Sequence, residues 1–486
     1  MYKKYKIALM SLIALCITSC DLNQLPNDKI TSETAWETVN DAVKFRTGIY
    51  SIFNGINGGK HTYASDYQSD LLNATVSFGN RGGDLYRWDF TSAQYDIADI
   101  WRYNYECINN CSNIISNIDK ITGNNDDETA KLKMIKGEAY LMRAICYHTL
   151  VVRFAKDYEP QTAGTELGLP IITVVDPNNK PERSSLADTY TFIKNDIKEA
   201  RTYLTTVGAA NSIYLTADVI DALEARVDLY MHNYTEAVTL AQKIINKYPL
   251  LTDKESLANM WLNDEGSEII FKTFSSVDER TNEYASYLTF NTATGSYQPD
   301  FIPTKWVIDL YSNNDIRKTV YFRNDEVNCN DIVDHVYMLN KYPGNPALKK
   351  RNEDYYQMHK IFRSAEAYLI AAEAAFKDNK AADALGYLNS LRTKRGDVTA
   401  NASGDALFTL IKNEWVKEYI GENTRLNDLK RWHEGFQRHS PQPSEVVQAG
   451  DQYDSFKADV NNMKFVWEIP ANDLKANKNL KPNWGK

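Results

Sequence analysis

Two irregular stretches of the chain combine aromatic side chains with amide, carboxylate and guanidinium groups. Their candidate binding residues are Asp66, Tyr67, Asn80, Arg81, Trp88, Tyr284, Tyr287, Asn291, Tyr297 and Gln298. An exposed aromatic ring stacks on the apolar C–H face of a sugar or on a protein surface, and polar groups at its edge bind hydroxyls. The chemistry that these residue types offer is therefore non-covalent ligand binding. Local packing is the alternative for each aromatic, since the sequence does not show which rings are exposed.

Residues for catalysis or metal binding lack any diagnostic spacing. The chain has no G-x-S-x-G, H-E-x-x-H or Walker A motif, and its seven histidines form no ligand pair at helical spacing. Neighbouring acids such as Asp126-Asp127 are not evidence for the carboxylate pair of a glycosidase. The distance between the two carboxyl groups in space decides that mechanism, and the sequence does not give this distance. The acidic turn 263–268 lacks the ligand alternation of an EF-hand loop, so we expect it to be solvated. The sequence thus predicts no enzyme activity, no cofactor and no metal site.

The first twenty residues have the pattern of a bacterial lipoprotein signal. Three lysines, an apolar run over 7–17 and Ser19 precede Cys20. The apolar run is shorter than the roughly 20 residues of a membrane-spanning helix. We therefore predict a signal peptide over 1–19 and lipid attachment at Cys20. A plain signal peptide or a short transmembrane helix is the alternative.

Composition argues against several classes of protein. The 486 residues include 55 basic and 64 acidic side chains, and the net charge of −9 argues against nucleic acid or an anionic membrane surface as the main partner. No later stretch of about 18 apolar residues follows, so a lipid would be the only anchor. The remaining cysteines do not suggest a disulfide framework, and we expect Cys107, Cys111, Cys146 and Cys329 to be buried.

Periodicity predicts a mainly α fold class, a tetratricopeptide-like scaffold of helical hairpins with an inserted loop-rich region that holds a few short strands. Helical patterns cover about 32–53, 93–154, 185–248 and 354–432. Irregular ligand-binding insertions are expected over about 54–91 and 267–346, and residues 269–274 and 336–338 have strand character. We expect residues 20–486 to form one domain.

A weak internal repeat supports the scaffold of helical hairpins. Aligning Ala225 with Ala372 also pairs Ala237 with Ala384, Ala241 with Leu388 and Ile244 with Leu391. Each copy reads as a helix, a short turn and a second helix, and the pattern resembles tetratricopeptide units that long insertions interrupt. Two unrelated helical hairpins are the alternative.

Three further segments carry recognisable motifs. They are 136–144 (KGEAYLMRA), 363–374 (RSAEAYLIAAEA) and the series Glu414, Glu418, Glu422, Arg425, Asp428-Leu429 and Arg431-Trp432. Together with the weaker match at 467–470 (WEIP), they resemble the SusD/RagB family of Bacteroidetes outer-membrane lipoproteins. The third segment departs from the family pattern, because Gly421 replaces a usual phenylalanine and Asn423 a usual glycine. Asparagine tolerates a left-handed backbone, whereas the missing phenylalanine leaves a packing gap.

The charged residues of these motifs are predicted to have a structural role. Glu138, Arg143, Glu373, Arg425 and Asp428 lie on otherwise apolar helices. An unpaired charge at such a position is costly, so we expect each to pair with an opposite charge where helices pack together.

The resemblance to the SusD/RagB family implies four tetratricopeptide-like units and an inserted ligand-binding half. It also implies a lipid-anchored protein of the outer membrane that faces outward and binds an oligosaccharide or polysaccharide without catalysis. Such a protein would deliver the glycan to a TonB-dependent SusC-like transporter as part of polysaccharide utilisation. The resemblance does not identify any ligand-binding residue in this chain. It implies that Trp101 lies in the core, and we expect Trp261, Trp306 and Trp415 to lie there as well. A tetratricopeptide-type adaptor lipoprotein that binds peptide or protein is the alternative.

Overall fold

The computed structural model describes residues 35–484 except 63, 177 and 282. The predicted signal peptide over 1–19 and the predicted lipidation at Cys20 lie outside the described residues. Within the described part, helices dominate and strands are short, which confirms the mainly α fold class. None of the described helices combines the length and the apolar composition that crossing a membrane requires.

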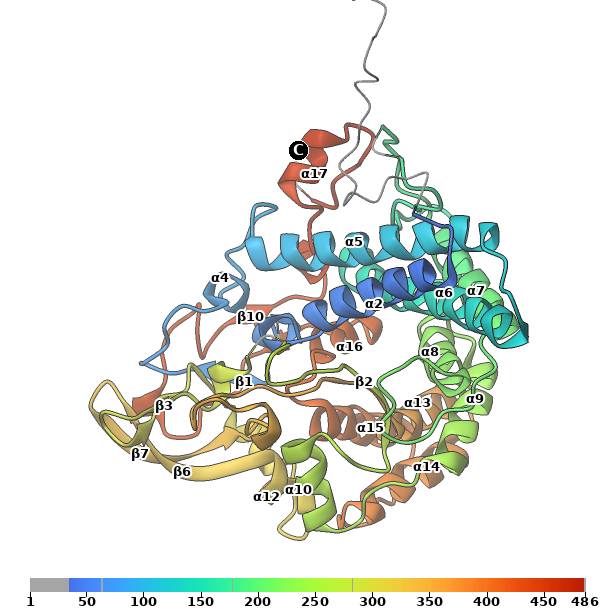
Figure 1. Cartoon of the computed structure of the whole chain (residues 1–486). Helices are drawn as coiled ribbons and strands as arrows, with labels where there is room; N and C mark the ends of the chain where they lie inside the picture. Colours follow the sequence, from blue (N-terminus) through green and yellow to red (C-terminus); the bar gives the residue numbers. More distant parts are fainter. Residues whose placement is uncertain (1–34, 63, 177, 282, 485–486) are drawn as a thin grey trace, which may run out of the picture.

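Four long helices of the N-terminal half lie along the upper and right sides of the molecule (Figure 1). They are α2 (Val39–Ile56), α5 (Tyr95–Asn117), α6 (Asp126–Phe154) and α7 (Leu186–Tyr203). Local sequence sets where they begin: Thr38 and Asp41 form a capping box at α2, and the Asn125 side chain accepts from the Glu128 backbone N–H at α6. Helix α6 packs against α2, α5 and α7, which makes it the central element of this layer.

Two helical hairpins form the right side of the molecule (Figure 1). The first consists of α8 (Ala217–Tyr230) and α9 (Tyr234–Lys247), the second of α13 (Ser364–Lys377) and α14 (Ala381–Lys394). Helix α9 packs on α13, and the Tyr387 hydroxyl donates a 2.9 Å hydrogen bond to the Gln242 side chain. The two copies of the sequence repeat are therefore neighbours in space, although long insertions separate them along the chain.

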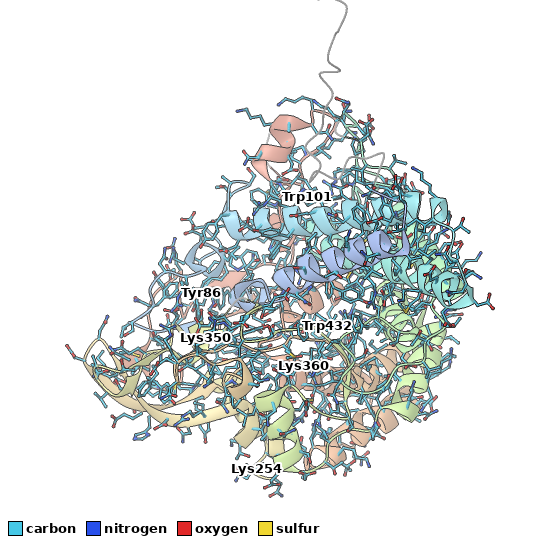
Figure 2. All side chains as sticks on the ribbon, in the orientation of Figure 1. Tyr86, Trp101, Lys254, Lys350, Lys360 and Trp432 are labelled. Carbon is cyan, nitrogen blue, oxygen red and sulfur yellow. The ribbon has the colours of Figure 1, made fainter. Side chains whose placement is uncertain are left out.

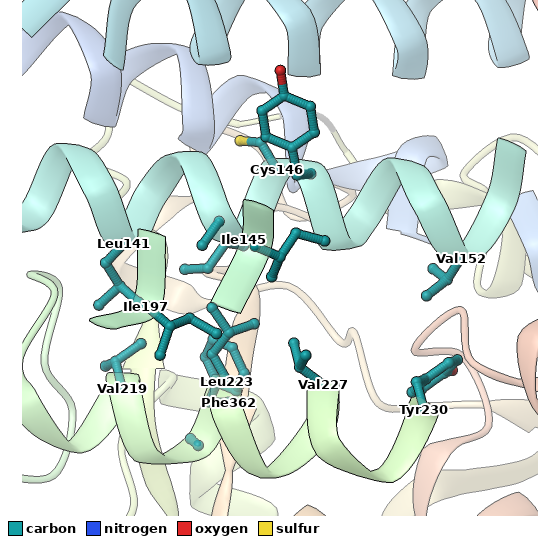
Figure 3. Close-up of a cluster of buried hydrophobic side chains, with 14 of the residues drawn as sticks. Leu141, Ile145, Cys146, Val152, Ile197, Val219, Leu223, Val227, Tyr230 and Phe362 are labelled. Atoms are coloured by element: carbon teal, nitrogen blue, oxygen red, sulfur yellow. The ribbon is translucent and has the colours of Figure 1, made fainter. Parts of the chain in front are cut away.

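The core between α6 and α8 joins the upper layer to these hairpins. Figure 3 shows the facing side chains Leu141, Ile145 and Val152 of α6 and Val219, Leu223, Val227 and Tyr230 of α8, with Ile197 and Phe362 beside them. All of them are buried, and each such burial contributes roughly 1.5–3 kcal/mol. The four cysteines that were expected in the interior are buried and free.

The strands and most of the remaining helices are short, and Figure 1 shows β3, β6 and β7 at the lower left and α17 at the top. The strands are β1 (Leu72–Ala74), β2 (Ile269–Lys272), β3 (Phe290–Asn291), β4 (Ser296–Tyr297), β5 (Phe301–Pro303), β6 (Phe322–Cys329), β7 (Ile332–Leu339), β8 (Lys360–Arg363), β9 (Phe436–Gln437) and β10 (Lys457–Ala458). One sheet has the order β3-β4-β6-β7, and β1–β5, β2–β8 and β9–β10 are antiparallel pairs. The other helices are α3 (Ala64–Tyr67), α4 (Gly83–Tyr86), α10 (Lys254–Asn263), α11 (Lys305–Asp309), α12 (Ile316–Tyr321), α15 (Gly404–Tyr419), α16 (Arg425–Arg431) and α17 (Ala471–Ala476).

The five charged residues of the sequence motifs pair with opposite charges, as predicted. Glu138, Arg143 and Glu373 do so between helices, whereas Arg425 pairs with a loop residue and Asp428 with a residue of its own helix. Arg143 of α6 donates to Asp196 of α7 at 2.7 and 2.8 Å, and Arg431 of α16 donates to Glu373 of α13 at 2.8 and 2.9 Å. The other pairs are Glu138 with Arg46, Arg425 with Asp70 and Asp428 with Arg431. Bidentate geometry fixes the angle between partners as well as their distance.

A buried network of charges lies between the hairpins and the strand-rich region. The Glu418 carboxylate of α15 accepts hydrogen bonds from three arginines: Arg317 at 3.0 Å, Arg363 at 2.8 Å and Arg395 at 2.9 Å. Burial alone would raise the pKa of Glu418, but the three guanidinium groups more than offset it and hold that pKa well below its usual value. Arg395 also donates to both oxygens of Glu268, at 2.6 and 2.9 Å.

Two expectations from the sequence are corrected by this network. The turn 263–268 is only partly solvated. Asn263 and Glu265 are exposed, but Asp264 and Glu268 are fully buried, and Asp264 pairs at 2.5 Å with Lys360, which Figure 2 places near the centre of the molecule. The helix expected from about residue 354 begins only at Ser364, because Lys360–Arg363 form β8 against β2 and carry Lys360 and Arg363 to their buried carboxylates.

The packing gap expected at Gly421 is filled. This glycine has φ +81°, and a Cβ there would lie 2.6 Å from the Leu339 side chain. The Tyr342 hydroxyl donates to the Gly421 carbonyl at 2.8 Å. Asn423 has φ +67°, which confirms the left-handed turn. Residues of the inserted region thus occupy the space that a phenylalanine side chain would take.

We expect Glu418→Gln to lower the free energy of unfolding by about 3–5 kcal/mol, because three buried arginines lose their shared counter-charge. Glu236→Gln, at an exposed position of α9, is the matched control and should change stability by less than about 0.5 kcal/mol. Urea unfolding measures both. The pKa of Glu418 is depressed in the folded protein. The contribution of Glu418 to stability is therefore fully present above pH 4.5, the ordinary pKa of a glutamate, and is lost at lower pH. The Glu418→Gln variant lacks this pH dependence. Equal effects of the two variants would contradict the role of the network.

Candidate ligand-binding site

Five of the ten candidate binding residues are buried, which corrects the expectation that they offer exposed surfaces. They are Asp66, Tyr67, Trp88, Tyr284 and Tyr287. Burial raises the pKa of Asp66 to about 7, and its carboxylate accepts from the Asn423 backbone N–H at 3.2 Å. The Tyr67 ring stacks on Phe301 with centroids 4.2 Å apart, and Tyr284 stacks on Tyr342 at 4.1 Å. These residues hold the inserted region together.

Trp88 shows why an aromatic in an irregular segment is not necessarily a binding platform. Its backbone has φ +56°, its side chain is 5% exposed, and its indole N–H donates to the Gln68 carbonyl at 2.7 Å. The ring packs against Phe436, Phe456 and Phe465 with centroids 5.0–5.9 Å apart. No face of this ring is left for a ligand.

Tyr297 of β4 is the aromatic candidate that keeps partial exposure. It pairs with Phe290 of β3 in the strand register, and the two rings meet edge to face with centroids 5.0 Å apart. The exposed Arg323 of β6 places its guanidinium 4.8 Å from the Tyr297 centroid. Partial burial raises the pKa of Tyr297, so its hydroxyl stays protonated at neutral pH. The arrangement combines a fixed ring with a hydrogen-bond donor group beside it.

Two side-chain amides lie in or directly after the same pair of strands as this ring. The Asn291 side chain donates to the Gln298 side-chain oxygen at 3.2 Å, and both residues are half-buried. Asn291 also accepts from the Ala293 backbone N–H at 2.9 Å, which orients its amide. Side-chain amides held in this way retain further donor and acceptor capacity for ligand hydroxyls.

Asn80 and Arg81 approach the same region from the loop after β1. Arg81, whose side chain is 52% exposed, forms a 2.7 Å ion pair with the buried Asp300, two residues after Gln298. The Gly79 backbone N–H donates to the other Asp300 oxygen at 3.0 Å. The fold therefore connects the loop carrying Asn80 and Arg81 to the segment carrying Asn291, Tyr297 and Gln298; we call these five residues the loop–sheet surface.

Sequence reasoning missed Phe290, Arg323 and Asp300. Phe290 and Arg323 contact Tyr297 only because β4 pairs antiparallel with β3 and parallel with β6, a register that no local pattern shows. Asp300 lies two residues after Gln298. An acidic residue within this aromatic segment was the sequence signal that could have identified Asp300 as part of the site. Among the tryptophans expected in the core, Trp306 is half-buried and stacks on His439 at 4.2 Å, whereas Trp101, Trp261 and Trp415 are buried.

Comparisons with known proteins give a consistent family. Residues 237–485 match the model of the SusD family, and residues 22–217 match a model described as starch-binding associating with outer membrane. A SusD-like protein P2 of Formosa agariphila is 22% identical over 99% of both chains. A putative sugar binding protein of Bacteroides vulgatus is 27% identical with a TM-score of 0.77, covering 93% of this chain and 99% of its own. A SusD superfamily protein of Bacteroides thetaiotaomicron shares the fold, with 24% identity, a TM-score of 0.79 and coverage of 92% and 100%.

We expect Trp88→Ala to lower the free energy of unfolding by about 3–5 kcal/mol, because it leaves a cavity among three phenylalanines. Trp88→Phe should cost less, since it keeps an aromatic ring and loses only the indole hydrogen bond. Tyr297→Ala should cost no more than about 1 kcal/mol, because the ring is only partly buried. Urea unfolding of the three variants measures these changes in the free energy of unfolding. A Trp88→Ala variant as stable as the parent would show that Trp88 is not a core residue.

Proposed function

The chain belongs to the SusD family, and from that premise we propose that it is a non-catalytic glycan-binding lipoprotein of the outer membrane. It captures an oligosaccharide or polysaccharide at the cell surface and delivers it to a TonB-dependent SusC-like transporter. The starch-binding description of the model matched by residues 22–217 and the sugar-binding relative of Bacteroides vulgatus support glycan as the ligand class. The description of the same model supports the outer membrane as the location.

The loop–sheet surface is the observation that carries the proposal. Its ring, Tyr297, is held by Phe290 and flanked by Arg323, and its amides come from Asn291 and Gln298. A sugar ring that stacks on Tyr297 presents hydroxyls to Arg323, and the amides of Asn291 and Gln298 offer further hydrogen-bond partners in or directly after the same pair of strands. Stacking supplies affinity, and the amides and the guanidinium supply orientation.

The mechanism involves binding and release only. A glycan held on one side by a single aromatic ring and a polar edge remains open to solvent, so it transfers without any bond being broken. Release into a transporter requires a second surface that competes for the same sugar. Co-purification of the native protein with a TonB-dependent barrel, followed by profiling of bound glycans, tests this delivery step.

A second candidate function is an adaptor that binds peptide or protein. A hollow of about 700 Å³ lies between α5 and the C-terminal segment, and it includes Tyr95, whose side chain is 57% exposed, together with Arg102 and Asp473. An exposed aromatic with charged neighbours is typical of protein interfaces. This hollow uses none of the residues of the loop–sheet surface, so the two functions are separable by mutation.

We expect Tyr297→Ala to weaken glycan binding by about tenfold, because it removes the stacking ring. Asn291→Ala should weaken binding less, and Tyr95→Ala, which removes an exposed tyrosine elsewhere, is the matched control and should leave the affinity unchanged. A glycan array identifies the best oligosaccharide, and calorimetry measures its affinity for each variant. An array without any signal, combined with peptide binding that Tyr95→Ala abolishes, would favour the adaptor instead.

We also expect Cys20→Ser to abolish lipid attachment, since the hydroxyl does not replace the thiol in acylation. The variant should lose incorporation of an alkyne-labelled fatty acid and leave the membrane fraction, whereas Cys16→Ser should retain both. Protease added to intact cells should degrade the parent protein if its body faces outward. Membrane association of Cys20→Ser equal to that of the parent would contradict a lipid anchor at this residue.

A further inference from the structure

Two histidines and two carboxylates from three distant segments meet at one place outside the loop–sheet surface. Asp157 and Glu159 follow α6, His232 lies in the turn between α8 and α9, and His433 follows α16. The ligand atoms of Asp157, Glu159 and His232 all lie within 4.8 Å of one another. His433 Nε2 lies 2.8 Å from a Glu159 oxygen and 3.6 Å from Asp157 Oδ2.

Asp157 supplies an independent indication that a ligand belongs here. Its side chain is 6% exposed, and its Oδ2 accepts no hydrogen bond from any described residue. A buried carboxylate oxygen without a donor is costly, and native proteins usually satisfy such atoms with a protein group, water or an ion. The Oδ2 atom is the one that faces His433.

The neighbouring cations do not satisfy this carboxylate, because they are engaged elsewhere. Lys430 donates to the carbonyls of Val152 and Ala155, and Lys156 pairs with Glu166 at 2.9 Å. The nearby Arg431 is bound to Glu373 and Asp428, as described above. None of these three cations donates a hydrogen bond to Asp157 Oδ2, although Lys430 and Arg431 lie near enough to interact with the carboxylate electrostatically.

We propose that Asp157, Glu159, His232 and His433 bind a divalent transition metal ion, with zinc as the best match. Two imidazole nitrogens and two carboxylate oxygens are a donor set that suits Zn²⁺, whereas Ca²⁺ and Mg²⁺ prefer oxygen ligands alone. Four-coordinate zinc with bonds of about 2.0–2.1 Å places its ligand atoms roughly 3.3 Å apart. Asp157, Glu159 and His232 already lie close together, and the His433 side chain, 57% exposed, has room to rotate toward them.

The surroundings give an ion a route to the site and a structural effect once bound. Asp157, Glu159 and His433 line a hollow of about 380 Å³ that opens to solvent. A bound ion connects the end of α6, the turn of the α8–α9 hairpin and the segment after α16. Because the unfolded chain does not assemble these ligands, binding stabilises the fold by mass action. This inference is independent of glycan binding, since no residue of the cluster belongs to the loop–sheet surface.

The test uses the full-length protein without a histidine tag, stripped with EDTA and titrated with ZnCl₂ by calorimetry and with CoCl₂ by absorption. We expect one equivalent of metal to bind, with the intense visible bands of four-coordinate Co²⁺. Zinc at about 100 times its dissociation constant should raise the melting temperature by about 3 °C. His232→Ala and His433→Ala should each weaken zinc binding at least about tenfold and remove the Co²⁺ bands.

One control and one further ligand variant keep the proposal open to refutation. His335→Ala removes an exposed imidazole on β7 and should leave metal binding unchanged. Glu159→Gln keeps the size of a partly exposed side chain, so it should fold as the parent does and still lose affinity. Absence of saturable zinc binding, a weak six-coordinate Co²⁺ spectrum, or an equal loss of affinity in His335→Ala and His433→Ala would each overturn the site.

Discussion

The carboxylate of Glu418, shared by three buried arginines, is the interaction on which the rest of the molecule depends. Arg317 comes from α12 of the inserted region, Arg363 from the end of β8 and Arg395 from the end of α14. One side chain on α15 thus orients the inserted region and the second helical hairpin at once. The cost of removing these charges from water offsets much of their mutual attraction. The main contribution of the network is therefore to fix the relative orientation of its segments, because a charged residue that moves away leaves its neighbour buried and unpaired.

This constraint explains how a loop-rich insertion presents a defined surface. Because β8 and α12 are held at the network, the sheet β3-β4-β6-β7 and its loops are built outward from a fixed base. The buried aromatics Tyr67, Tyr284 and Trp88 fill the space between the sheet, the loop after β1 and the C-terminal strands. The aromatic richness of this region therefore serves packing first, and the partly exposed Tyr297 is the aromatic candidate left for a ligand.

The two proposed binding sites lie in different parts of the fold. The loop–sheet surface belongs entirely to the insertion and its neighbouring loop, as expected for binding residues carried on a rigid frame. The cluster of Asp157, Glu159, His232 and His433 belongs to the ends of scaffold helices and connects segments that only helix packing brings together. The two proposed sites share no residue, so mutations can test glycan binding and metal binding separately.

The sequence by itself determined the features that depend on short-range pattern. Helical periodicity predicted the long helices, the small residues of the repeat predicted two hairpins, and charges on apolar helices such as Arg143 and Glu373 predicted buried pairs, because each of these follows from residues within a few turns of one helix. Tertiary structure alone decided which rings are exposed, that Asp264 and Glu268 are buried, that β8 replaces the start of a helix, and that His232 and His433 lie beside the same carboxylates. Each of these depends on contacts between segments far apart in the chain, where burial and pairing override local preference.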